Sequence, residues 1–89
     1  ALGGGESLTF AAGYSGVFSV FCLGADAQGV TERRLNYTLE GAELTAHFPL
    51  GVSNAFIGES AYISLESGVL IVYWADNPEL PLPERGRLL

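Results

Sequence analysis

The stretch "SGVLIVYWAD" (Ser67–Asp76) contains seven apolar or aromatic residues in a row, from Val69 to Ala75. A strand with one face in water alternates apolar and polar side chains, so an uninterrupted run predicts a strand that is covered on both faces. A second run, "VFSVFCL" (Val17–Leu23), is interrupted only by Ser19. The sequence therefore predicts two strands whose second faces need a cover.

The other segments are short and are separated by glycine-rich turns. Ser7–Ala11 alternates apolar and polar residues, whereas Gly13–Gly16 and Gly24–Gly29 have the composition of a turn and a loop. No stretch repeats apolar residues at the i, i+3, i+4 spacing of an amphipathic helix. We therefore predict an all-β fold of about six mostly antiparallel strands, arranged as a small barrel or a two-layer sandwich.

Two hairpins are predicted from the alternation of residue types. In Arg33–Phe48 the apolar positions alternate on both sides of Glu40-Gly41, which indicates a two-residue turn there. In that register Arg34 lies opposite His47, and Thr38 lies opposite Glu43. The second hairpin is predicted over Ala61–Asp76 with Ser67-Gly68 at its tip.

The ends of the chain differ in composition from its middle. Residues 1–6 are predicted to be a flexible N-terminal segment, and residues 7–76 a single all-β domain. Residues 77–89 contain Pro78, Pro81 and Pro83, which favour an extended, Pro-rich tail because proline is not accommodated inside a helix.

The composition indicates more apolar surface than one small domain can bury. Hydrophobic residues make up 48% of the chain and charged residues only 16%, against about 25% charged in a typical domain. We therefore expect a homo-oligomer, since symmetric self-association is the commonest way to cover such a surface. The residues expected at the interface are Phe18, Val20, Leu70, Val72, Leu80 and Leu82.

Charge and motif content exclude several classes of partner. The net charge is −6, and the basic residues are four arginines with no lysine, so no basic stripe is available for nucleic acid. The longest apolar run is far shorter than the roughly 18 residues that span a bilayer, so no membrane partner is expected. The single cysteine, Cys22, excludes an internal disulfide, and no export signal is visible, so we expect a cytoplasmic protein.

No recognisable catalytic or metal motif is present. One histidine, one cysteine and scattered carboxylates do not give the spacing of a metal site, and no cofactor is expected. Cys22 lies inside a strand run, where a buried small hydrophobe is expected rather than an activated nucleophile. The polar face of the first predicted hairpin, with Arg34, Glu43 and His47, is an ordinary solvated face or the floor of a pocket.

Three hypotheses follow. The first is a non-catalytic interaction or assembly module that homo-oligomerises through its doubly apolar strands. The second is a module that binds a small apolar or cationic ligand in an aromatic pocket. The third is a small enzyme in which His47 acts with Glu43. The residues predicted to contact a ligand are Trp74, Tyr73, Tyr62, Phe21, Glu43, His47 and Arg34.

Overall fold

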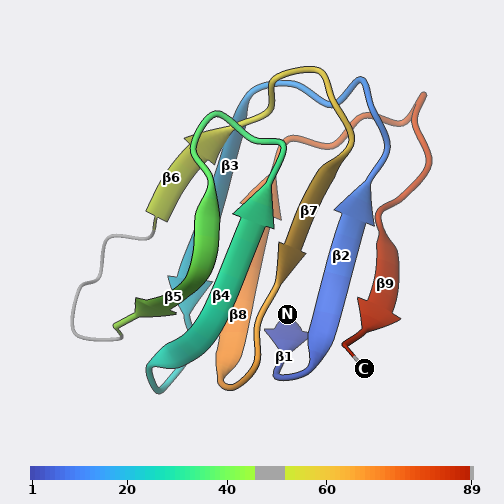
Figure 1. Cartoon of the computed structure of the whole chain (residues 1–89). Coiled ribbons are helices and arrows are strands. Elements are labelled where there is room, and N and C mark those ends of the chain that lie inside the picture. The colour runs from blue at the N-terminus through green and yellow to red at the C-terminus, as the bar shows by residue number, and fades with distance from the viewer. Residues whose placement is uncertain (46–51, 89) are drawn as a thin grey trace.

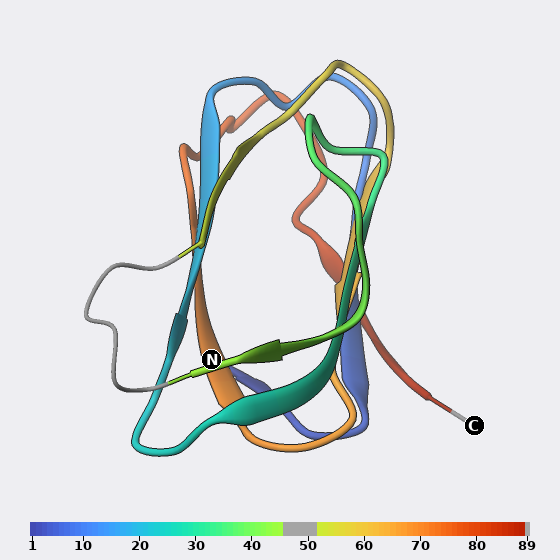
Figure 2. The same ribbon diagram turned by 60° about the vertical axis from the view of Figure 1, so that its left-hand side comes forward.

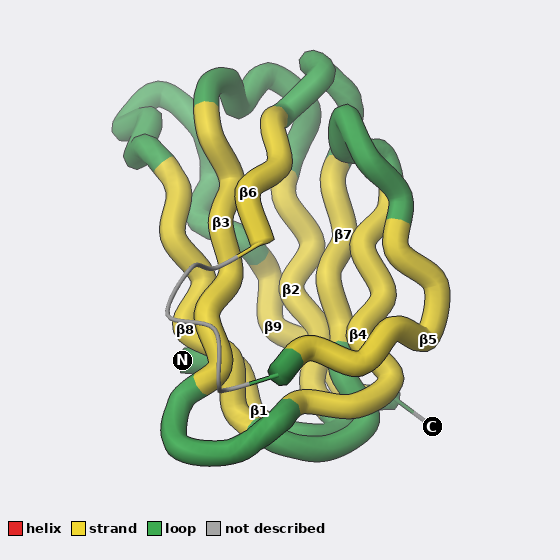
Figure 3. Tube along the Cα trace, turned by 90° about the vertical axis from the view of Figure 1, so that its left-hand side faces the viewer, coloured by secondary structure: helices red, strands yellow, loops and turns green. Residues whose placement is uncertain are grey.

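The computed structural model describes residues 1–45 and 52–88, and these form an all-β sandwich of two antiparallel sheets (Figures 1 and 3). The predicted fold class is confirmed, although the described residues form more strands than the six expected. The strands are β1 (Leu2–Gly3), β2 (Glu6–Phe10), β3 (Val17–Cys22), β4 (Ala27–Arg33), β5 (Leu39–Leu44), β6 (Val52–Ala55), β7 (Ala61–Ser64), β8 (Val69–Trp74) and β9 (Glu84–Arg87).

The strands are divided between a four-stranded and a five-stranded sheet. Sheet A has the order β1-β8-β3-β6, and sheet B has the order β5-β4-β7-β2-β9. Figure 2 shows the two layers from the side, with β3 and β8 in one layer and β2, β4 and β7 in the other. Each sheet therefore has an inner face toward the core and an outer face.

The two apolar runs form the two central strands of sheet A and pair with each other. Phe18 lies opposite Trp74, Val20 opposite Val72, and Phe21 opposite Ile71. Phe18, Val20 and Leu70 point inward and are fully buried. Val17, Phe21, Ile71 and Tyr73 point outward and are exposed, whereas Ser19, between Val17 and Phe21, is buried. One face of each run is thus covered by sheet B, and the described residues leave large apolar side chains exposed on the other.

Aromatic rings fill one end of the core. Phe10 of β2 makes edge-on contacts with Tyr14, Phe18, Phe56 and Trp74, at ring-centroid distances of 5.6, 5.5, 5.4 and 5.0 Å. Such edge-to-face pairs add to the free energy gained by burial. Because Phe18 and Trp74 belong to sheet A and Phe10 to sheet B, this cluster joins the two layers.

The predicted hairpin at Glu40-Gly41 is wrong. Leu39–Leu44 is one strand, β5, which runs through Gly41 and pairs with β4. Glu32 lies opposite Leu39 and Val30 opposite Ala42, so β5 has one extra residue, and Gly41 adopts a φ of 60° there. A bulge shifts the alternation by one residue, as a two-residue turn does, and this is why the pattern resembled a hairpin. The predicted pairing of Arg34 with His47 stays a prediction, since His47 lies outside the described residues.

The second predicted hairpin is also wrong. β7 lies in sheet B and β8 in sheet A, so the Ser67-Gly68 segment is a corner between sheets. Its backbone is held by β4, since Glu66 and Ser67 both donate backbone hydrogen bonds to the Gln28 carbonyl. Two strands that are adjacent in sequence here face each other across the core.

The two ends of the chain join the sandwich, which moves the expected domain boundaries. Leu2 is fully buried and pairs with Leu70, so β1 belongs to sheet A rather than to a flexible segment. At the other end β9 pairs with β2. The segment between β8 and β9 contains Pro81, whose carbonyl accepts a 2.6 Å hydrogen bond from the Tyr14 hydroxyl. The tail thus packs on its own domain.

Candidate functional site

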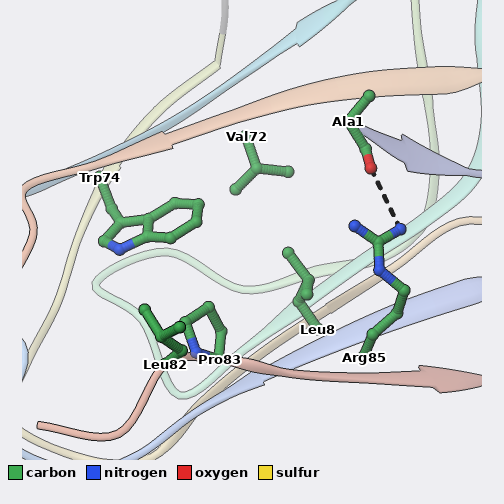
Figure 4. A pocket seen from close by; sticks show the side chains of 7 residues that line it. All are labelled: Ala1, Leu8, Val72, Trp74, Leu82, Pro83 and Arg85. Carbon is green, nitrogen blue, oxygen red and sulfur yellow. Dashed lines mark hydrogen bonds between the residues drawn. The ribbon is translucent and has the colours of Figure 1, made fainter.

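A cleft opens between the two sheets beside β8 and β9 (Figure 4). Its volume is about 320 Å³, at the lower end of the size range of small-molecule sites. The residues that line it are Ala1, Leu8, Val72, Trp74, Leu82, Pro83 and Arg85.

The walls of the cleft are mostly apolar and contain one large aromatic ring. Val72 and Trp74 come from β8, Leu8 comes from β2, and Leu82 and Pro83 belong to the segment that leads into β9 (Figure 4). The Trp74 ring packs against Phe10 with an interplanar angle of 81°, which fixes it against the core. The indole therefore offers a positioned aromatic surface to a ligand in the cleft.

One end of the cleft carries a neutralised charge. Arg85 Nη1 donates to both carboxylate oxygens of Glu6 and to the Ala1 carbonyl, each at 3.2 Å. Glu6 also accepts a 2.7 Å hydrogen bond from the Gly3 backbone N–H. That N–H, followed by Arg85, holds the pKa of Glu6 below its ordinary value. A positively charged ligand would thus meet an ion pair at this end rather than a free arginine.

A second polar feature lies inside the sandwich, between β4 and β6. Glu32 is fully buried, and its Oε1 accepts a 2.9 Å hydrogen bond from Asn54 Nδ2. Asn54 Nδ2 also donates to the Tyr37 carbonyl, at 2.7 Å, and its Oδ1 accepts from the backbone N–H groups of Tyr37 and Ala55. The Glu32–Asn54 pair therefore joins the two sheets and holds the turn that precedes β5.

The Glu32 carboxyl is poorly placed to carry a charge. Its Oε2 is buried and has no hydrogen-bond partner in the described part of the chain. Burial raises the pKa of Glu32, and the hydrogen bond from Asn54 opposes that rise only in part. The pair lies outside the cleft, so Glu32 is a structural group rather than one that contacts a ligand there.

One family model matches most of the chain. The family model described as "Thiamin pyrophosphokinase, vitamin B1 binding domain" matches residues 8–70. The chain belongs to this family. No curated protein and no solved structure matches it significantly.

Membership of a vitamin B1 binding family agrees with the second hypothesis, a small-molecule binding module, better than with the first. The matched residues run from β2 to the start of β8 and include the Glu32–Asn54 pair. Of the residues that line the cleft, only Leu8 lies within the match. The described part of the chain holds no group of three or more side chains that could bind a metal ion, and no helix long and apolar enough to span a bilayer.

The residues predicted to contact a ligand do not come together. Trp74 lines the cleft, but Tyr73 and Phe21 point away from it on the outer face of sheet A. Tyr62 lies on the outer face of sheet B, where the Arg33 guanidinium is 5.9 Å from its ring centre. The prediction failed because a strand presents successive aromatic residues to opposite faces.

The predicted polar ligand contacts are scattered as well. Glu43 accepts a 2.8 Å hydrogen bond from Gln28 Nε2 on the surface. Arg34, with a φ of 59°, forms part of the turn before β5 and donates to the Ser60 carbonyl. His47 lies outside the described residues, so its suggested action with Glu43 stays a prediction.

The predicted interface residues have other positions in the fold. Phe18, Val20 and Leu70 belong to the core, and Leu80 packs against it. Val72 and Leu82 line the cleft. These six residues therefore do not form a surface for a second subunit. The prediction placed Phe18, Val20, Leu70 and Val72 on the outer face of sheet A, whereas they lie on its inner face.

Sequence reasoning missed most of the cleft. Pro83 and Arg85 were assigned to a separate tail, and Leu8 to an ordinary strand. Their meeting depends on β9 pairing with β2, in which Leu8 lies opposite Arg85. The sequence did carry a signal for the buried carboxyl. Glu32 lies two residues after Val30, so in a strand both side chains point to the same face.

Proposed function

We propose that this chain binds thiamin, and that its role is recognition of the vitamin rather than catalysis. The observation that carries the proposal is the family match over residues 8–70. Thiamin joins an aminopyrimidine to a positively charged thiazolium ring, which agrees with the small cationic ligand considered from the sequence. The net charge of −6 favours the approach of such a cation.

We further propose that the cleft beside Trp74 receives the vitamin. Its volume of about 320 Å³ suits a ligand of two linked rings. Tryptophan is the best aromatic partner for an organic cation, and the Trp74 indole faces the cleft (Figure 4). The pairing of Arg85 with Glu6 removes the repulsion that an isolated arginine would exert on the thiazolium.

Titration with thiamin tests both statements. Trp74 is the only tryptophan, so its fluorescence reports directly on the cleft. We expect a saturable change on adding thiamin and a much smaller one on adding an aminopyrimidine that lacks the thiazolium ring. By calorimetry, Trp74→Leu is expected to weaken binding about tenfold or more, whereas the control Tyr62→Leu, on the outer face of sheet B, leaves it unchanged.

The outcomes separate the function from its location. Absence of heat and of a fluorescence change up to millimolar thiamin would refute the binding function. Equal affinity of the wild type and a folded Trp74→Leu variant would refute the cleft while leaving the function in place. We also propose that the chain alone does not transfer a pyrophosphoryl group, so no thiamin diphosphate is expected when it is incubated with ATP, Mg²⁺ and thiamin.

We retain self-association as a second proposed role. The observation that favours it is the exposure of large apolar side chains on the outer face of sheet A, including Val17, Ile71 and Tyr73. This role does not compete with ligand binding, because the cleft opens on the inner side of β8.

A further inference from the structure

The segment that leads from β8 to β9, residues 75–83, presents a large apolar side chain to water beside the cleft. Leu82 is 76% exposed, the highest value among the large hydrophobic residues that the structure describes, and it also lines the cleft. Leu82 and Pro83 lie across the cleft from Trp74 (Figure 4). A ligand held between these two walls would cover apolar surface that is otherwise in water, and this favours binding.

The backbone on both sides of Leu82 is fixed. Pro81 and Pro83 flank it, and a proline restricts both its own φ and the conformation of the residue before it. The Pro81 carbonyl accepts the 2.6 Å hydrogen bond from the Tyr14 hydroxyl. On the other side, Glu84 begins β9, which pairs with β2. The position of Leu82 is therefore set before a ligand arrives, which lowers the entropy cost of binding against it.

The first part of the segment is anchored by a turn and by the core. The Asn77 Oδ1 atom accepts a 3.0 Å hydrogen bond from the Glu79 backbone N–H, and the Asn77 carbonyl accepts one of the same length from Leu80. The Leu80 side chain packs against the core and over Gly13, where an added Cβ would lie 3.4 Å from its methyl groups. Leu82 is thus presented by a segment that is held at several points.

One aromatic ring of the core supports both walls of the cleft. Phe10 contacts the Trp74 ring at a centroid distance of 5.0 Å and the Tyr14 ring at 5.6 Å. Tyr14 is 1% exposed, and its ring also packs against Phe56 at 5.6 Å. Because Trp74 forms one wall and the Tyr14 hydroxyl holds the backbone beside Leu82, the same core cluster sets the gap between the two walls.

We propose that Leu82 is a specificity-determining contact of the cleft, positioned by the hydrogen bond of Tyr14, and that the two walls select flat aromatic cations over rounded cations of the same charge. A flat ring can present one face to Trp74 and the other to Leu82, and so contacts both walls over a large area. A rounded quaternary ammonium touches either wall with few atoms. This inference rests on the proposed function and names the class of ligand that its site selects.

Calorimetric titration with thiamin and with choline tests the proposal, since both carry one positive charge and only thiamin is built of flat rings. We expect the wild type to bind thiamin at least about 30-fold more tightly than choline. Leu82→Ala is expected to weaken thiamin binding about tenfold and choline binding less than about twofold. Leu23→Ala is the matched control, because it truncates the same side chain at a 52% exposed position outside the lining of the cleft, and it should change neither affinity.

Tyr14→Phe tests the positioning role, because it keeps the ring in the core and removes only the hydroxyl that holds Pro81. We expect thiamin affinity to fall about fivefold with little change for choline, so the preference for the flat cation falls. A hydroxyl that merely supported the fold would lower both affinities by the same factor. Tyr62→Phe removes a hydroxyl on the outer face of sheet B and should leave the preference unchanged.

The outcomes separate this inference from the proposed function. Absence of thiamin binding to the wild type would remove both. Thiamin binding that Leu82→Ala leaves unchanged, or a wild type that binds choline as tightly as thiamin, would remove the inference and keep the function. Equal losses of both affinities in Tyr14→Phe would remove the positioning role of Tyr14. Urea unfolding shows which variants are folded, and Leu82→Ala changes an exposed side chain, so it tests the contact even if Tyr14→Phe does not fold.

Discussion

The outer faces of the two sheets have opposite chemistry, although the same short chain builds both. Sheet A exposes Phe21, Ile71 and Tyr73 and bears no charged side chain on its two central strands. Sheet B exposes hydroxyl and charged groups, including the ion pair of Arg33 with Glu40 at 3.0 Å. A sandwich that worked alone in water would need two faces of the second kind. The difference is the basis of the second proposed role, in which sheet A makes a protein contact and sheet B faces solvent.

The alternation within β3 gives the largest contrast. Phe18 is fully buried in the core, and Phe21, on the same strand, points outward. We expect Phe18→Ala to lower the free energy of unfolding by about 3–5 kcal/mol, because it leaves a cavity among the aromatic rings. Phe21→Ala should cost less than about 1 kcal/mol in the monomer. Urea unfolding at a low protein concentration measures both, and similar losses would contradict the assignment of inner and outer faces.

The pKa of a glutamate is raised on the inner face of sheet B and lowered on its outer face. Glu32 of β4 points inward, where burial raises its pKa, whereas Glu40 of β5 points outward, where Arg33 lowers the pKa of its carboxyl. The folded state therefore holds the Glu32 proton to a higher pH than the unfolded state does. By linkage, this group favours folding fully below its unfolded pKa and loses that contribution as the pH rises through the folded pKa.

We therefore predict that stability falls with rising pH over the range that begins near 4.5, the ordinary pKa of a glutamate, and extends upward. The slope from this single group is at most about 1.4 kcal/mol per pH unit. Glu32→Gln keeps the shape and an acceptor for Asn54 Nδ2 but cannot ionise, so its slope should be lower by that contribution. Urea unfolding at a series of pH values compares the two chains, and identical slopes would show that Glu32 does not titrate in this range.

Sequence reasoning predicted the all-β class and the two doubly apolar strands because both depend on local periodicity. It did not predict which strands pair. β3 and β8 are far apart in sequence yet adjacent in sheet A, while the neighbours β7 and β8 lie in different sheets. The bulge at Gly41 produced the same shift of alternation as a turn, and only the partner strand distinguishes the two.

The candidate site was less predictable than the fold for the same reason. Trp74 was identified because its residue type is informative by itself. The wall of the cleft opposite Trp74 depends on the pairing of β9 with β2. This pairing places Arg85 opposite Leu8, although the two residues are far apart in the sequence. The core cluster likewise depends on which face of β3 points inward, and the run Val17–Leu23 is mostly apolar on both faces. Local pattern cannot choose between two equally apolar faces.

The exposed ion pair of sheet B should show the smallest effect. Arg33 and Glu40 are both more than half exposed, so water and salt already screen their attraction. The lowered pKa of Glu40 gives this pair a contribution that is present above the unfolded pKa and is lost as the pH falls, opposite in sign to that of Glu32. We expect Glu40→Gln to leave the urea midpoint at neutral pH and the association state unchanged within error. A clear change in either would mean that this face takes part in a contact, and the distinction drawn between the two outer faces would then be wrong.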